Sequence, residues 1–135
     1  METVSLDLAR RMIKAARQYA QRAGLCLTIA VVDAGGHIIA LERMDGALLA
    51  SLETAQVKAR TSVYFGAPTR ALPMDQPFTP ALIGGVGYPV AFVPGGLPIR
   101  LSHALVGAIA VGGGTSEQDE AAAQAGLAAA QLGAS

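Results

Sequence analysis

A histidine stands where two predicted strands meet in the C-terminal part of the chain. Residues 97–101 (LPIRL) and 104–111 (ALVGAIAV) are predicted strands, and only Ser102 and His103 separate them. A two-residue hairpin turn requires positive φ, for which Asn-Gly or Asp-Gly is the usual choice. Because Ser-His fits such a turn poorly, we expect His103 to have a role beyond the turn. An imidazole titrates near neutral pH, so His103 is a candidate for proton transfer.

Two cationic side chains are candidates for binding an anionic ligand. Arg43 ends another predicted strand, and its planar guanidinium can bind a carboxylate through two hydrogen bonds. Lys58 lies on a predicted helix without an acidic residue four positions before it, so no helical ion pair accounts for it. Each also has an ordinary interpretation, Arg43 as a surface ion pair and Lys58 as a solvated residue. With His103, these two residues form the predicted catalytic set.

Other residues are predicted to contribute to the same ligand site. Asp45 is interpreted either as a ligand contact or as the cap of the second helix. His37 follows a tight turn in which Asp33 is expected to accept backbone N–H groups. The predicted ligand-binding set is Asp45, Gly95, Gly96, Arg100 and His37.

Neither a metal centre nor a disulfide is predicted. Metal sites need three or four ligands, and the two histidines occur without HxH or HExxH spacing. Cys26 is the single cysteine, which excludes an intrachain disulfide. It lies in an apolar segment, so we expect a buried, unreactive thiol.

Composition narrows the class of protein. The 135 residues fit one domain, residues 1–135, with 52% hydrophobic but only 4% aromatic residues. Ten basic and ten acidic residues give zero net charge, which argues against nucleic-acid binding. The N-terminus resembles no signal peptide and no 18-residue apolar run occurs, so we expect no membrane contact and a cytoplasmic location. High apolar content with low charge predicts surfaces buried between identical subunits.

The order of predicted elements indicates the fold class. Four prolines break residues 67–88, which we expect to form a loop with one or two helical turns over the mouth of the pocket. The other elements alternate between helix-like and strand-like patterns. An α+β fold follows, with helices on both faces of a five-stranded antiparallel sheet. The predicted helices are 5–22, 47–66 and 115–132, and the predicted strands are 25–34, 37–45, 89–93, 97–101 and 104–111.

Four segments taken together resemble the GlcG/HbpS-like family, which also includes the C-terminal domain of PduO-type proteins. They are residues 5–24, 28–47, 53–65 and 95–126, nearly the whole chain. The resemblance implies a profilin-like α/β/α fold, oligomers from dimers to octamers, and haem binding in some members. The chain departs from the family at Ser102-His103, where an Asp-Gly-like turn is typical, and in GAIAVGGG, where the family has GAIGVSGG.

These observations predict a homo-oligomer that binds a small organic ligand between subunits. In one version it is an enzyme without a cofactor, which isomerises, eliminates from or cyclises an organic acid or carbonyl compound by proton transfer. The resemblance supplies an alternative, a haem- or tetrapyrrole-binding protein with His37, His103 or Met44 as axial ligand and Arg43 or Lys58 on the propionates. A third interpretation is a non-catalytic assembly module.

Overall fold

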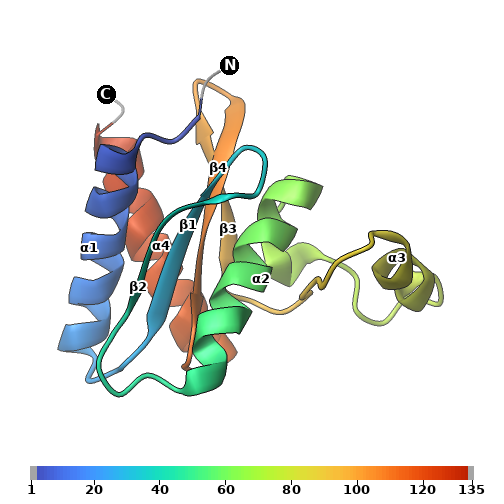
Figure 1. Cartoon of the computed structure of the whole chain (residues 1–135), viewed down its shortest axis with the longest axis horizontal. Helices are drawn as coiled ribbons and strands as arrows, with labels where there is room; N and C mark the ends of the chain where they lie inside the picture. The colour runs from blue at the N-terminus through green and yellow to red at the C-terminus, as the bar shows by residue number, and fades with distance from the viewer. Residues whose placement is uncertain (1–2, 134–135) are drawn as a thin grey trace.

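An antiparallel sheet forms the middle layer of the molecule, with helices α1 and α4 on one face and α2 on the other (Figure 1). The computed structural model describes residues 3–133. The elements are α1 (Leu6–Arg22), β1 (Thr28–Asp33), β2 (Ile38–Arg43), α2 (Leu49–Phe65), the 3₁₀ turn η1 (Thr69–Ala71), α3 (Thr79–Gly85), β3 (Gly96–Leu101), β4 (Ala104–Gly112) and α4 (Ser116–Gly133).

Helix α1 begins at a side-chain cap and packs closely against α4. The Ser5 hydroxyl accepts a hydrogen bond of 3.1 Å from the backbone N–H of Leu8, which satisfies one free donor of the first turn. A Cβ at Gly126 of α4 would lie only 2.9 Å from the Met12 carbonyl oxygen of α1. Small residues therefore allow these two helices to approach closely over the apolar core.

The sheet has the strand order β2-β1-β4-β3, and every neighbouring pair is antiparallel. The central strands β1 and β4 are almost entirely buried because both faces are covered by helices. Thr28 pairs with Gly112, and Asp33 pairs with Gly107. The register therefore puts the β1–β2 and β3–β4 turns at one end of the sheet and the glycines after β4 at the other.

The expectation of a five-stranded sheet was wrong: within residues 3–133 the sheet has four strands, and residues 89–93 form an irregular segment instead of a strand. The backbone groups of this segment bond to side chains instead of a strand. The N–H of Ala91 donates to the Thr61 hydroxyl at 3.0 Å, and the Thr69 hydroxyl donates to the Val93 carbonyl oxygen. Pro89 and Pro94, which lack N–H donors, bound the segment and disfavour a ladder.

Two local expectations also fail. Cys26 is exposed, because β1 begins only at Thr28 and the thiol lies in the connection after α1. Asp45 does not cap the second helix, which begins at Leu49 without a side-chain cap. The helical turns expected between residues 67 and 88 are present as η1 and α3, and α3 extends away from the sheet (Figure 1). No helix within residues 3–133 is long and apolar enough to cross a bilayer.

Candidate functional site

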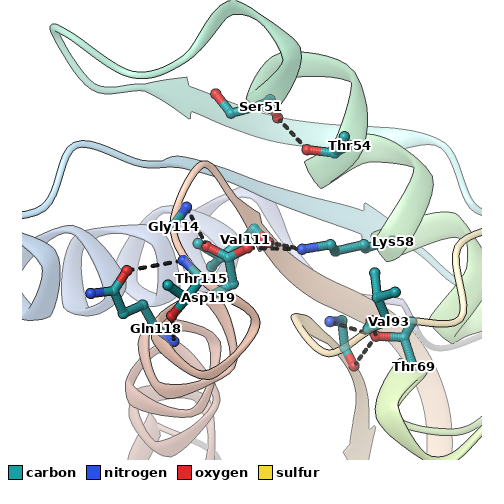
Figure 2. Close-up of polar contacts among 11 residues, drawn as sticks. Ser51, Thr54, Lys58, Thr69, Val93, Val111, Gly114, Thr115, Gln118 and Asp119 are labelled. Carbon is teal, nitrogen blue, oxygen red and sulfur yellow. Dashed lines mark hydrogen bonds and ion pairs between the residues drawn. The ribbon is translucent and has the colours of Figure 1, made fainter.

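Lys58 is buried where α2, β4 and the start of α4 meet, as Figure 2 shows. The residue is only 5% exposed. Its Nζ lies 2.9 Å from Oδ2 of Asp119 and 3.1 Å from the carbonyl oxygen of Val111. An ammonium withdrawn from water requires such partners, so this ion pair satisfies the charge and ties α2 to α4 past the end of the sheet.

Asp119 is fixed by the backbone at the start of α4. Its Oδ1 accepts a hydrogen bond of 2.8 Å from the N–H of Gly114, so both carboxylate oxygens have partners. Thr115 and Gln118 bond reciprocally beside it, at 3.2 Å and 2.9 Å, in the pattern of a capping box. The carboxylate also lies in the first helical turn, where the helix dipole favours a negative charge.

Gly95 and Gly96 make room for this lysine. A Cβ at Gly95, where φ is +132°, would lie 2.8 Å from Lys58 Nζ and 2.8 Å from the Val111 carbonyl oxygen. A Cβ at Gly96 would lie 2.7 Å from the Lys58 carbonyl oxygen. The structure therefore brings together three residues of the predicted site, but the glycines contact the lysine itself. We call this end of the sheet, with residues 95–96, 112–114 and the Lys58–Asp119 pair, the glycine end.

The pairing restricts what Lys58 can do chemically. Two of the three ammonium donors are already used inside one chain. An amine that binds an anion with full strength, or takes a proton from a substrate, would first have to leave the carboxylate of Asp119. Breaking a buried pair leaves an uncompensated charge and costs several kcal/mol, about 3–5 in measured cases.

Arg43 and Asp45 also lie toward the glycine end, but on the surface. Arg43 is opposite Thr28 in the sheet, and Thr28 is opposite Gly112 on its other side. Both side chains are exposed and line a hollow of about 430 Å³ between α1 and the end of β2. No hydrogen bond or ion pair joins either residue to Lys58 within residues 3–133, where the partners of Lys58 are Asp119 and Val111.

His103 lies at the opposite end of the sheet from Lys58. Ser102 and His103 adopt φ of 51° and 70°, the left-handed conformation of a tight hairpin turn, and both are exposed. Eight strand steps separate His103 from Val111, which is roughly 26 Å at about 3.3 Å per residue. The structure therefore does not bring together the three residues of the predicted catalytic set.

The end that carries His103, which we call the hairpin end, comprises the turns 34–37 and 102–103 and the C-terminal part of α2. Arg100 donates from Nη2 to the Gly66 carbonyl oxygen at 3.0 Å, where a cation complements the end of the α2 dipole. His37 is exposed after its turn. The expected role of Asp33 is confirmed: its Oδ1 accepts from the N–H of Gly35 at 2.9 Å and of His37 at 3.0 Å.

Aromatic side chains gather at the hairpin end. The rings of Tyr64 and Tyr88, and those of Phe65 and Phe92, meet edge to face at 5.3 Å and 5.4 Å, and Tyr64 also contacts Phe65. The Arg60 guanidinium lies 5.3 Å above the Tyr88 ring, a cation–π distance. We call these four rings with Arg60 the aromatic cluster.

The turn before His37 reaches this cluster. A Cβ at Gly36, where φ is +84°, would lie 3.4 Å from Arg60 Cγ and 3.7 Å from Val63 of α2. Burial raises the pKa of Tyr88 above its ordinary value near 10, Tyr64 acts in the same direction, and Arg60 opposes them. The hairpin end thus combines imidazoles, cations and aromatic faces.

Several of these residues had no distinct role in the sequence interpretation. Asp119 lies in the first turn of α4, and its partner Lys58 is 61 positions away in the sequence. The sequence signal for a buried acidic partner was Lys58, a lysine among small apolar residues with no acid one helical turn before it. The chain has only six aromatic residues, and the aromatic cluster holds four of them. This low number was the sequence signal that could have drawn attention to the cluster. Within the described part of the chain, no three His, Cys, Asp or Glu residues gather as metal ligands.

The comparisons with known proteins identify the family. The model of the haem-degrading HbpS-like proteins matches residues 4–128. The chain belongs to the HbpS-like family. The resemblance seen in the sequence is thereby confirmed.

Two curated relatives support the assignment. This HbpS-like chain is 30% identical over 129 residues to a 15.0 kDa protein from the dhaT–dhaS intergenic region of Citrobacter freundii, which covers 93% of this chain and 90% of the relative. It is 31% identical over 109 residues to the protein GlcG of Escherichia coli K12, which covers 80% of each.

Two solved structures share the fold closely. The Klebsiella pneumoniae protein ORFY superposes with a TM-score of 0.89 at 28% identity, over 97% of this chain and 92% of that one. A complex of PduOC with haem gives a TM-score of 0.85 at 30% identity, over 94% of both chains. The α/β/α architecture is therefore that of the relatives.

Proposed function

We propose that this HbpS-like protein binds haem or a related tetrapyrrole at the hairpin end, enclosed between copies of the chain. The observation that carries the proposal is the gathering of two exposed histidines, Arg100 and the aromatic cluster, which includes Arg60, at one end of the sheet. The haem complex of the relative PduOC supports it. The same end supplies each type of group that a haem requires.

The chemistry of these groups fits the parts of a haem. A neutral imidazole nitrogen ligates iron, and both His37 and His103 present exposed rings. Aromatic faces suit the flat macrocycle, and an arginine can bind a propionate through two hydrogen bonds. Arg60, beside the turn of His37, is the nearest cation for that role on α2.

Three of the residues predicted to contact haem, Met44, Lys58 and Arg43, are less suitable in this structure. The Met44 sulfur accepts a hydrogen bond from the Leu27 N–H at 3.4 Å and packs against the main core, so it is a poorer axial ligand. Lys58 is paired with Asp119, and Arg43 lies toward the glycine end. We therefore assign the axial ligand to His37 or His103 and the propionate contacts to Arg60 and Arg100.

Self-association follows from the exposure of this end. Tyr64 of the aromatic cluster is 55% exposed, so one chain leaves aromatic surface at this end open to water. A bound macrocycle would remain half solvated unless a second copy covered it. We expect dimers or larger assemblies, up to octamers. Light scattering that gives 13.7 kDa, the mass of one chain, in the presence of haem would contradict this.

A haem titration of the purified protein tests the function. We expect a shifted Soret band with saturable binding, and loss of the shift in either His37→Ala or His103→Ala. Arg60→Ser should weaken binding, whereas Arg43→Ser, a matched arginine at the other end, should not. Soret spectra that stay unchanged in the double histidine variant would overturn the assignment of the site. A wild-type protein that gives no shift would overturn haem binding itself.

The geometry gives less support to the proton-transfer enzyme. His103 and Lys58 lie at opposite ends of β4, and the lysine is already paired. Such an enzyme would have to use residues of two chains. It stays a prediction, as does the assembly module, which would be favoured if neither haem nor an organic acid bound.

A further inference from the structure

A crevice runs between α1 and β2 on the opposite face of the sheet from α2. It contains two adjoining hollows of about 440 Å³ and 430 Å³, which share Arg17 and Glu42 as lining residues. These two side chains form an ion pair that joins the helix to the strand. Figure 1 shows α1 and β2 side by side along this face. The two hollows therefore adjoin at this ion pair, between α1 and the edge strand β2.

The hollow of about 440 Å³ has an excess of positive charge. Arg10, Arg11, Lys14 and Arg17 line it together with two acids, Asp7 and Glu42. Arg11 lies 3.5 Å from Asp7, and Arg17 pairs with Glu42. Arg10 and Lys14, both exposed, have no acidic partner among residues 3–133. Their spacing of four residues puts both charges on one face of α1.

The strand that borders this groove has an open edge. Among the strands of the described residues, β2 pairs with β1 alone, so about half of its backbone N–H and C=O groups point outward. The other edge strand, β3, has a proline at position 98, which lacks an N–H donor and disfavours further pairing. β2 has no proline, and its one irregularity, beside Ile39, leaves residues 40–43 in regular register with β1.

We propose that this crevice binds an extended, acidic peptide segment of another protein, which adds a strand beside β2. Main-chain hydrogen bonds to the free edge would supply affinity, as in other complexes where a peptide extends a sheet. Acidic side chains that point toward α1 would contact Arg10 and Lys14. The six residues of β2 set the length of the bound segment, about 20 Å. This inference is independent of haem binding.

A second copy of the chain is a poorer occupant because it offers no suitable acidic strand. Outside the helices, the acids of residues 3–133 are Asp33, Glu42, Asp45 and Asp75. Glu42 and Asp45 line the crevice themselves, and Asp33 is engaged in its own turn. Asp75 stands alone in its segment. Charge complementarity therefore favours a partner with several carboxylates in one extended segment.

Fluorescence anisotropy with a labelled octapeptide of alternating glutamate and valine, flanked by glycines, tests the proposal. We expect saturable binding that weakens as salt rises from about 0.05 to about 0.5 M. The double variant Arg10→Ser, Lys14→Ser should bind about tenfold more weakly, since two charge contacts are lost. Arg22→Ser, a matched loss of an exposed arginine from α1 outside both hollows, should leave the affinity unchanged.

Two further probes separate a strand-adding peptide from any bound polyanion. The same peptide with N-methyl groups on alternate residues should lose binding, because it cannot donate to the edge of β2. Hydrogen exchange of residues 38–43 should slow when the unmodified peptide binds. Equal binding of a lysine-for-glutamate peptide, of the N-methylated peptide or of a DNA oligonucleotide would overturn the proposal. It would also fail if Arg10→Ser, Lys14→Ser changed the assembly mass and no peptide bound.

Discussion

The two ends of the sheet use their polar residues in opposite ways. At the glycine end, the charged side chains of Lys58 and Asp119 are buried and bonded to each other and to the backbone. At the hairpin end, His37 and His103 are exposed. A buried pair with satisfied partners holds the structure, whereas groups on exposed turns remain available to a ligand. The lysine that stood out in the sequence thus belongs to the end built for stability.

The largest expected effect is the loss of Lys58. Lys58→Met leaves the carboxylate of Asp119 buried without its cation, so the free energy of unfolding should fall by about 3–5 kcal/mol. Urea unfolding followed by circular dichroism measures it. Lys14→Met is the matched control, because Lys14 is the other lysine and is exposed. A loss below about 1 kcal/mol, as for a surface pair, would show that the Lys58–Asp119 pair contributes little.

A substitution of Gly95, which packs against Lys58, should give the second largest loss of stability. In Gly95→Ala the new methyl group meets both Lys58 Nζ and the Val111 carbonyl oxygen, and the positive φ adds strain. We expect a loss of about 1–3 kcal/mol of unfolding free energy, the usual range for overpacking. Gly84→Ala in α3 is the control, since a Cβ there has nothing within 4 Å. Equal melting temperatures for the two variants would contradict the close approach.

At the hairpin end, a substitution that introduces glycine should leave the free energy of unfolding unchanged or raise it. His103 has φ of 70°, which glycine adopts without steric cost, so His103→Gly should be neutral or stabilising by at most about 1 kcal/mol. His37→Gly is the matched control, because the backbone at His37 has no positive φ and glycine there gains only flexibility. If His103 ligates haem, its variant should lose the Soret shift despite its stability. A destabilised His103→Gly protein would show that the imidazole makes contacts needed for the fold.

The sequence predicted much of the fold because most elements carry local signals. The cap at Ser5, the alternating hydrophobic patterns and the prolines of residues 67–88 placed three helices and four strands close to their observed positions. The fifth strand failed because the hydroxyls of Thr61 and Thr69, distant in sequence, bond the backbone that a ladder would have used. Such side-chain contacts leave no mark in local propensity.

The candidate site was harder to predict, since it depends on which end of the sheet each residue occupies. Lys58, Gly95 and Gly96 lie together, but only the structure shows that Asp119 pairs with the lysine. Arg43 lies near the end of one predicted strand and His103 in the turn between two others, yet the strand directions place them at opposite ends of the sheet. The pairing register of the strands determines this separation, and the spacing of residues in the sequence does not predict it.

The smallest expected effect concerns Tyr88 in the aromatic cluster. Because burial raises its pKa above the ordinary value near 10, the folded protein holds this proton more tightly than the unfolded chain does. Its contribution to stability is therefore complete below about pH 10 and is lost as pH rises through the folded pKa. Tyr88→Phe should lose less stability between neutral and strongly alkaline pH than the wild type, as urea midpoints would measure. Tyr19→Phe is the matched control.

Arg60 provides the second arm of this test. Its guanidinium opposes the shift, so Arg60→Gln should raise the pKa of Tyr88 further, and the absorbance of tyrosinate should appear at higher pH. The same variant is expected to weaken haem binding. If Arg60→Gln left the tyrosinate titration unchanged and Tyr88→Phe lost as much stability in alkali as the wild type, Tyr88 would be solvated in the folded protein. The hairpin end would then lack the partly buried aromatic surface that a flat macrocycle needs.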